Sequence, residues 1–216
     1  MTDEPMTDKI IPLTDPVALP APEAVPLLPA PPMLERTGDD LLPGDPDPRE
    51  LVARMIRVNH AGEYGAKRIY EGQLAVLKRT RIAPTIRHMK EQEQAHLDAF
   101  EKLIVERRVR PTLLHPVWHV AGFALGAATA LLGERAAMAC TVAVEEVIDE
   151  HYSAQSARLG KDEAPLKETI EQFRTEELEH RDIGLKHEAQ LAPGYELLST
   201  AIKAGSRAAI WLAERF

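Results

Sequence analysis

Apolar residues recur every three to four positions along most of the chain beyond residue 48, and no stretch keeps the two-residue alternation of a strand. The pattern therefore predicts an all-α chain. Short connections between helices are typical of bundles in which consecutive helices run antiparallel. The expected helices lie at about 48–79, 84–110, 134–159, 165–191 and 196–216, with a further apolar segment at 111–133.

Two helix ends carry clear local signals. At the start of the first helix, Asp47 suits the N-cap, Pro48 the first turn and Glu50 the capping-box position. At the end of the fourth helix, Gly160 is expected as the left-handed residue that stops it.

Residues 1–48 differ from the rest of the chain in composition. They contain twelve of the seventeen prolines, and ten acidic residues against two basic ones. Proline at this density removes backbone donors, and the segment has too little apolar surface to form a core. We therefore expect a disordered Pro-rich acidic tail over 1–48 and one folded domain over 49–216.

The apolar segment 111–133 contains no Asp, Glu, Lys or Arg. Its length allows a transmembrane span, a buried core helix, or an apolar helix that lies on a bilayer. His115, Pro116 and His119 within it argue against a span, which would also separate two halves of the chain that need each other. The helix lying on the bilayer is favoured, with Arg107, Arg108 and Arg110 beside it for contacts with lipid phosphates.

Two Glu-x-x-His pairs carry the clearest chemical signal in the chain. They are Glu93 with His96 and Glu177 with His180. At this spacing on a helix, the carboxylate and the imidazole stand on one face, about 5–6 Å apart at their Cβ atoms. Each pair can therefore hold one metal ion between its two side chains.

A single glutamate precedes each pair at a similar interval. Glu63 stands 30 residues before Glu93, and Glu145 stands 32 residues before Glu177. Glu145 shares its helix face with apolar residues, whereas Glu146 is rotated about 100° away. A carboxylate on an apolar face needs a partner, and a metal cation can serve several such groups at once.

Two helical hairpins thus repeat one layout, a lone Glu followed by Glu-x-x-His. This layout matches the di-iron carboxylate pattern of ferritin-like four-helix bundles. Four carboxylates and two imidazoles suit two iron or manganese ions, with open positions left for dioxygen.

Composition adds two limits. Cys140 is the only cysteine, so an intrachain disulfide and a Cys-based zinc site are excluded, and a small core residue in a reducing compartment is expected. The net charge of −8 is unevenly spread, because residues 49–110 hold fourteen basic against eight acidic side chains. The acidic balance of the whole chain therefore says little about its partners.

Three longer runs resemble the demethoxyubiquinone hydroxylases, the di-iron monooxygenases of ubiquinone biosynthesis. They are Arg54–Ala66, Ala137–Glu146 and Glu176–Gly184, and the similarity covers about residues 50–216. The resemblance implies a ferritin-like four-helix bundle with an apolar membrane-facing helix and a C-terminal helix. It also implies hydroxylation of the demethoxyubiquinol ring at C6 with dioxygen.

The resemblance assigns roles to individual residues of this chain. It implies two iron ions held by Glu63, Glu93, His96, Glu145, Glu177 and His180. The resemblance does not settle which carboxylates bridge the two ions. The candidates are Glu93 and Glu177, or Glu145. Arg54, His151 and Tyr152 match positions that the family connects with electron and proton delivery beside the cluster. NADH is the implied candidate reductant, although the chain has no Gly-x-Gly-x-x-Gly motif.

The implied substrate carries a polyprenyl tail and lives in a bilayer. The expected partners are therefore this quinol, the membrane surface and an accessory protein of the ubiquinone pathway, with no nucleic acid. The expected location is the cytoplasmic side of the cell membrane, as a peripheral protein.

Two other functions compete with this hypothesis. A ferritin-like iron-storage or iron-buffering protein would use the same bundle, and the uncharged segment 111–133 counts against it. A non-catalytic membrane-binding helical module would leave Glu63 and Glu145 unexplained on their apolar faces.

Overall fold

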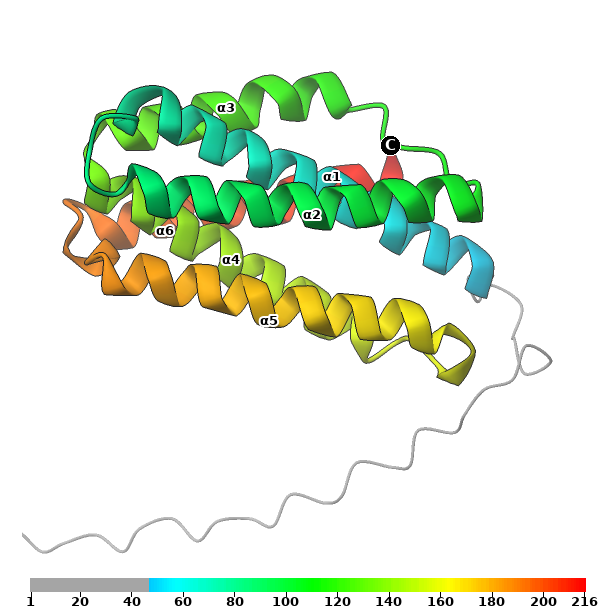
Figure 1. The fold of residues 1–216 in the computed structure, drawn as a ribbon. Coiled ribbons are helices and arrows are strands. Elements are labelled where there is room, and N and C mark those ends of the chain that lie inside the picture. The colour runs from blue at the N-terminus through cyan, green and yellow to red at the C-terminus, as the bar shows by residue number, and fades with distance from the viewer. Residues whose placement is uncertain (1–46) are drawn as a thin grey trace, which may run out of the picture. The chain divides into compact units, whose positions relative to one another are not determined.

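The computed structural model describes residues 47–216, and these residues form six α-helices without a strand. The expected disordered tail lies outside the described residues, except for Asp47 and Pro48 at the start of the first helix. Two single 3₁₀ turns, η2 and η3, flank α5. The elements are α1 (Pro48–Leu77), α2 (Ala83–Arg107), α3 (His115–Leu131), α4 (Glu134–Ser156), η2 (Lys161–Glu163), α5 (Ala164–Lys186), η3 (Ala189–Leu191) and α6 (Tyr195–Arg215) (Figure 1).

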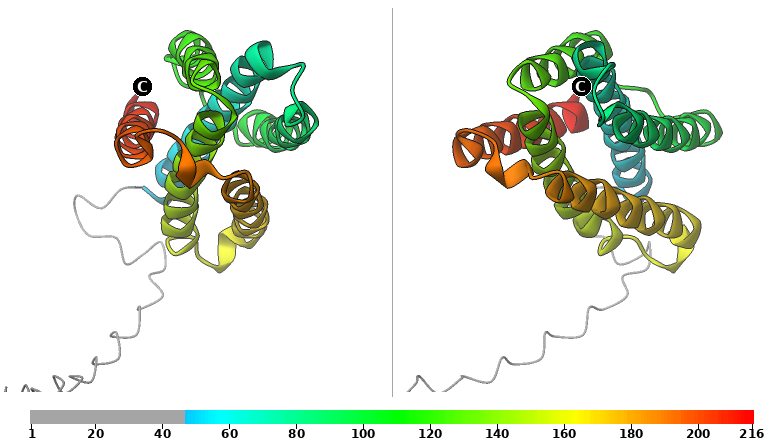
Figure 2. Two further views of the ribbon diagram at one scale, coloured as in Figure 1. Left: turned by 90° about the vertical axis from the view of Figure 1, so that its left-hand side faces the viewer. Right: turned by 60° about the vertical axis from the view of Figure 1, so that its left-hand side comes forward.

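The six helices are arranged in three layers (Figure 2). Helices α1 and α4 form the middle layer, α2 and α5 cover one side of it, and α3 and α6 cover the other. The hairpins α1–α2 and α4–α5 together make the expected four-helix bundle, because short connections keep each pair antiparallel. The all-α prediction is confirmed.

The helix ends follow the local signals at one place and depart from them at another. The Asp47 side chain accepts from the Arg49 N–H at 2.8 Å, as an N-cap should, whereas Glu50 pairs with Arg54 one turn on. The expectation for Gly160 is wrong: it is extended, with φ −80°, and leads into η2. Helix α4 already ends at Ser156, so no left-handed residue is needed at position 160.

Helix α3 is shorter and more exposed than the uncharged segment that contains it. In the part of the chain that the structure describes, no helix is long and apolar enough to cross a membrane. Only Gly126, Thr129 and Ala130 of α3 are buried, so the core-helix interpretation is wrong. Its outer side carries exposed apolar residues, among them Val117 and Val120.

Glycines let α3 lie directly on the backbone of α1. A Cβ atom on Gly126 would come within 1.9 Å of the Ile69 carbonyl oxygen. A Cβ atom on Gly72 would come within 2.2 Å of the Phe123 carbonyl oxygen. Both obstacles are backbone atoms, which cannot swing aside, so this contact between α1 and α3 requires glycine at both positions.

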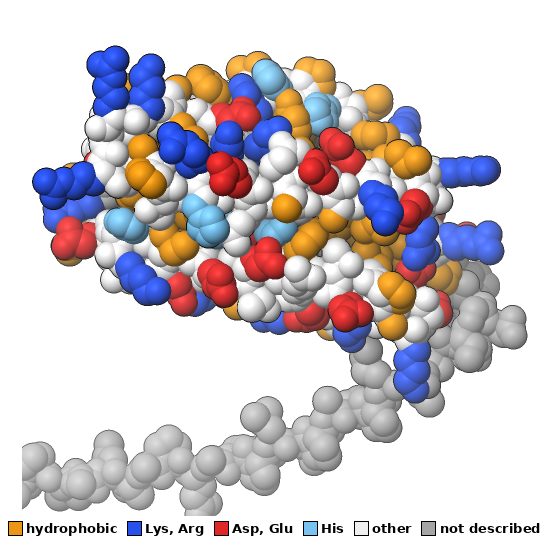
Figure 3. Space-filling model, viewed as in Figure 1, with side chains coloured by type: hydrophobic (Ala, Val, Ile, Leu, Met, Phe, Trp, Pro, Cys, Tyr) orange, Lys and Arg blue, Asp and Glu red, His pale blue; other side chains and the backbone are white. Residues whose placement is uncertain are grey.

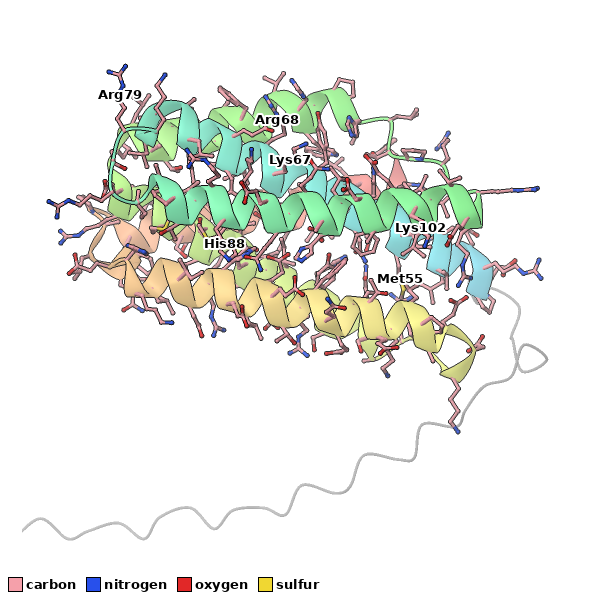
Figure 4. All side chains as sticks on the ribbon, viewed as in Figure 1. Met55, Lys67, Arg68, Arg79, His88 and Lys102 are labelled. Carbon is pink, nitrogen blue, oxygen red and sulfur yellow. The ribbon has the colours of Figure 1, made fainter. Side chains whose placement is uncertain are left out.

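Other reactive or titratable side chains lie in the core or on the surface. Cys140 is fully buried on α4, as expected of a small core residue. His88 lies exposed on the outer face of α2 and His187 follows α5, also exposed (Figure 4). Figure 4 also shows Met55, which is buried in the core, on the first turns of α1.

Candidate metal centre

Six buried side chains from four helices meet inside the bundle. Each is at most 2% exposed, although all six are polar or charged. They contribute two overlapping groups whose ligand atoms lie within 4.8 Å of one another. One group is made by Glu63, Glu93, His96 and Glu177. The other is made by Glu93, Glu145, Glu177 and His180.

Glu93 and Glu177 belong to both groups, whereas Glu145 belongs to one. The two shared carboxylates come from α2 and α5, the helices that carry the Glu-x-x-His pairs. This geometry favours the first of the two bridging alternatives that the spacing left open, in which Glu93 and Glu177 lie between two metal positions.

Both imidazoles turn Nδ1 toward the carboxylates. His96 Nδ1 lies 3.0 Å from Glu177 Oε1 and 3.4 Å from Glu63 Oε2. His180 Nδ1 lies 3.0 Å from Glu177 Oε2 and 3.2 Å from Glu93 Oε1. Each imidazole therefore presents one nitrogen to the cluster in a position suited to metal binding.

The other nitrogen of each imidazole donates a hydrogen bond away from the cluster. His96 Nε2 donates to Glu176 Oε2 at 2.7 Å, and His180 Nε2 donates to Gln92 Oε1 at 3.0 Å. A proton on Nε2 leaves Nδ1 free to bind a metal, and such bonds also fix the ring orientation.

Two tyrosines hold the two lone glutamates across the middle layer. Tyr70 on α1 donates to Glu145 Oε1 on α4 at 2.9 Å. Tyr152 on α4 donates to Glu63 Oε1 on α1. Each tyrosine stands seven residues after a lone glutamate, so it shares that glutamate's helix face and reaches the glutamate of the other helix.

The carboxylate oxygens that remain fit metal ions. Glu63 Oε2, both oxygens of Glu93 and Glu145 Oε2 are buried without a hydrogen-bond partner. Burying such groups alone is costly. The charges of two divalent cations would balance four carboxylates, and mixed oxygen and imidazole donors are ligands that iron and manganese accept.

The pKa values show how strongly the six groups interact. Burial and the neighbouring carboxylates raise the pKa of Glu93 and Glu145 well above the ordinary value. Burial also opposes charge on Glu177 and His96, but the hydrogen bonds of the cluster outweigh it. They lower the pKa of Glu177 to about 2 and raise that of His96 to about 12. Glu93 and Glu145 therefore hold protons unless cations replace them.

The three remaining candidate residues are placed differently. Tyr152 reaches the cluster through Glu63, whereas His151 binds Asn59 and Gln155, one step further out. Arg54 does not join the cluster: it pairs with Glu50 and its side chain is 46% exposed. Nine residues separate Arg54 from Glu63, which is about half a turn off the same helix face.

An apolar groove of about 510 Å³ lies between α3 and α6, over α1 and α4. Its lining includes Val58 and Ile69 on α1, Trp118 and Leu125 on α3, and Ile202 on α6. Almost all of its wall is apolar, so it suits a hydrocarbon chain.

Between this groove and the cluster lies a closed crevice, which has no room for a water molecule. Ala66, Ile69 and Val144 line both the groove and the crevice, and Glu145 lines the crevice's inner side. Thr141 also lines it, with a buried hydroxyl that has no hydrogen-bond partner. Gln73 donates to the Ala137 carbonyl, the acceptor that a helical threonine at position 141 would ordinarily use.

Sequence reasoning missed the residues that hold the metal-facing side chains. Tyr70, Gln92, Glu176 and Thr141 were not among the predicted site residues. For Tyr70 a signal existed, because Glu63 to Tyr70 repeats the seven-residue interval from Glu145 to Tyr152. For Gln92 and Glu176 the signal was their position directly before the two Glu-x-x-His pairs.

The fold and the site together define a class of protein. Two helices with one inward glutamate and two with an inward Glu-x-x-His pair characterise the ferritin-like bundles that hold a carboxylate-bridged metal pair. Residues 50–213 match the model of the family described as ubiquinone biosynthesis protein COQ7. The chain belongs to this family.

Individual relatives agree with the family. A relative from Rhodospirillum rubrum named 3-demethoxyubiquinol 3-hydroxylase is 61% identical, over 83% of this chain and 85% of its own. A rat relative named NADPH-dependent 3-demethoxyubiquinone 3-hydroxylase, mitochondrial, is 58% identical over 78% and 79%. A Saccharomyces cerevisiae relative named 5-demethoxyubiquinone hydroxylase, mitochondrial, is 44% identical over 76% and 78%.

The relatives' names bear on two expectations. They number the demethoxy position of the quinone 3 or 5, where the resemblance implied hydroxylation at C6. The rat relative's name specifies NADPH, whereas NADH was the expected reductant.

Proposed function

We propose that the chain hydroxylates the ring of demethoxyubiquinol with dioxygen at a pair of iron ions, as a step of ubiquinone biosynthesis. The observation that carries this proposal is the apolar groove beside the buried carboxylate–histidine cluster, separated from it only by the crevice that Ile69, Val144 and Glu145 line. An iron store needs no such groove, so the arrangement favours the hydroxylase over iron storage. Membership of the COQ7 family supports the substrate class.

The proposed iron ligands are Glu63, Glu93, His96, Glu145, Glu177 and His180, with Glu93 and Glu177 shared between the two positions. Bound iron would supply the activation of dioxygen and its insertion into the ring. One oxygen atom becomes the ring hydroxyl and the other leaves as water, with two electrons from a nicotinamide nucleotide. NADPH, as in the rat relative's name, and NADH are the two candidates.

The protein's own task is to bring the ring to the cluster without water. The polyprenyl tail would lie in the groove, and the ring would enter through the crevice beside Ile69 and Val144. The crevice is much narrower than the groove, so these side chains must move for the ring to pass. The Thr141 hydroxyl then offers a hydrogen bond to a ring oxygen, since it has no partner in the protein.

The groove lies between the two helices whose apolar side chains face outward. Val117 and Val120 on α3 and Trp211 on α6 are each more than half exposed. These helices support peripheral attachment to a bilayer, where the quinol would enter the groove directly. The proposed location is the cytoplasmic side of a cell membrane. An accessory protein of the pathway that delivers lipid would dock on the same two helices.

The decisive experiment follows the quinone itself. The iron-loaded protein is reduced under anaerobic conditions, mixed with demethoxyubiquinone of short tail length, and exposed to ¹⁸O-labelled dioxygen. We expect a product that contains one labelled oxygen atom, in amounts that depend on NADPH or NADH when turnover is multiple. His180→Ala should hold less iron and give no product. An unchanged quinone with full iron loading of the wild-type protein would leave iron storage as the better function.

A further inference from the structure

The two imidazoles donate their outer hydrogen bonds to different kinds of acceptor, although the two halves of the centre otherwise repeat one layout. Glu176 directly precedes Glu177 and Gln92 directly precedes Glu93, and each supports the histidine of the other hairpin. His96 donates to the Glu176 carboxylate at 2.7 Å, whereas His180 donates to the Gln92 amide oxygen at 3.0 Å. One half of the centre therefore has a charged acceptor where the other half has a neutral one.

Several other features of the two halves match, although Phe173 stacks on His96 at 4.0 Å between centroids and Tyr70 meets His180 edge-on at 6.1 Å. Tyr70 holds Glu145 and Tyr152 holds Glu63, each by one hydroxyl. Both imidazoles are at most 1% exposed and both turn Nδ1 inward. Glu176 and Gln92 thus differ in charge, although both accept a hydrogen bond from the outer nitrogen of an imidazole.

A carboxylate acceptor changes the ligand that it supports. A hydrogen bond from Nε2–H to a negative oxygen is shorter and stronger than one to an amide, and it leaves more electron density on Nδ1. We propose that the two metal positions are unequal, and that the position at His96 and Glu63 binds a divalent cation more tightly because Glu176 supports His96. This inference rests on the two-metal site proposed above.

The two proposed metal positions also lie at different distances from the crevice. The weaker position is the one at His180 and Glu145, and Glu145 is the proposed ligand that lines the crevice toward the groove. The cation held less firmly is therefore the one nearest the entering ring. The firmly held cation lies at Glu63, which does not line the crevice.

The test is an anaerobic titration of metal-free protein with Co²⁺, followed by visible absorption, on four proteins. The wild-type chain should bind two Co²⁺ per chain in two separable steps. Glu176→Gln should weaken the tight step by about 10- to 100-fold and bring the two steps together. Gln92→Glu should instead tighten the weak step and also bring them together, now at the higher affinity.

Glu179→Gln is the matched control, because it removes the same charge from an exposed position on the same helix. It should titrate like the wild-type chain. The inference is overturned if Glu176→Gln keeps the wild-type separation of steps, or shifts no more than Glu179→Gln does. It is also overturned if Glu176→Gln and Gln92→Glu move the same step. A wild-type chain that binds fewer than two Co²⁺ would overturn the metal pair itself, which separates the two failures.

Discussion

At the scale of single residues, the site depends on buried polar groups whose partners are few. His60 illustrates this on the outer side of α1, one turn before Glu63. Its ring stacks on His115 at 5.9 Å between centroids, and its Nδ1 is buried without a partner. Burial and the neighbouring His115 lower the pKa of His60 to about 4. The ring is therefore neutral in the folded chain at any pH above that value.

This shift predicts a loss of stability in mild acid. Because the folded-state pKa of about 4 lies below the ordinary 6.5, the unfolded chain binds the proton first, and stability falls as the pH drops from 6.5 toward 4. At pH 5 the loss from His60 is up to about 2 kcal/mol. His60→Gln should lose less of its free energy of unfolding between pH 7 and pH 5 than the wild-type chain does.

The measurement is urea unfolding of both proteins at the two pH values. His88→Gln serves as control, since it removes an imidazole from the exposed face of α2. It should keep the wild-type pH dependence. If His60→Gln and the wild-type chain lose the same free energy of unfolding between pH 7 and pH 5, the result contradicts a neutral buried His60.

At the scale of helices, local sequence carried most of the prediction. Periodic apolar residues placed the starts of the five helices other than α3 within about one residue and their ends within about five, because a helix face is encoded by spacing along one segment. The same spacing selected Glu145 over Glu146, and Glu145 is the buried member of the pair. These predictions needed no knowledge of neighbouring helices.

The spacing of apolar residues could not predict which side chains of different helices contact each other. The hydrogen bonds from His180 to Gln92 and from Tyr70 to Glu145 join residues 88 and 75 positions apart. Such bonds depend on how each helix is rotated against its neighbour, which the spacing within one helix does not encode. The surface position of α3 was favoured but not fixed, since the glycine contacts that seat it involve the backbone of α1.

The close contact between α3 and the backbone of α1 predicts that a single added methyl group at Gly126 destabilises the fold. Gly126→Ala would force a Cβ atom toward the Ile69 carbonyl oxygen, so α3 must move outward. We expect a loss of about 1–3 kcal/mol in the free energy of unfolding, together with faster hydrogen exchange in α3. Gly205→Ala on α6 is the control, because a Cβ atom there meets nothing within 4 Å. It should be neutral or stabilising by up to about 1 kcal/mol. Equal stability of the two variants would contradict the close contact between α1 and α3.

At the scale of the whole domain, apolar and basic surfaces lie near each other. In Figure 3 hydrophobic side chains follow the upper edge of the view, where α3 lies, and Lys and Arg side chains project at both ends. Figure 4 places Arg79 at the end of α1, pointing away from the bundle, and Arg68 beside α3. Exposed apolar side chains with cations at their border suit the surface of an anionic bilayer.

The exposed valines of α3 test this attachment better than its aromatic residues do. Trp118 and Phe123 are partly buried, so their loss would disturb packing as well as binding. Val117 and Val120 are 51% and 65% exposed, and each stabilises the bound state by about 1.5 kcal/mol if it enters the bilayer. The double variant Val117→Asn, Val120→Asn should therefore bind anionic vesicles at least about tenfold more weakly in a sedimentation assay.

A valine on the opposite layer provides the matched control. Val105 is 76% exposed and belongs to α2, the helix that covers the side of the middle layer opposite α3 and α6, so Val105→Asn makes the same chemical change on a different layer. This variant should sediment with vesicles as the wild-type chain does. If it loses as much binding as the double variant, or if the double variant binds normally, the bilayer does not meet α3. The groove would then have to receive its quinol from a carrier in solution, because its open side lies between the same two helices.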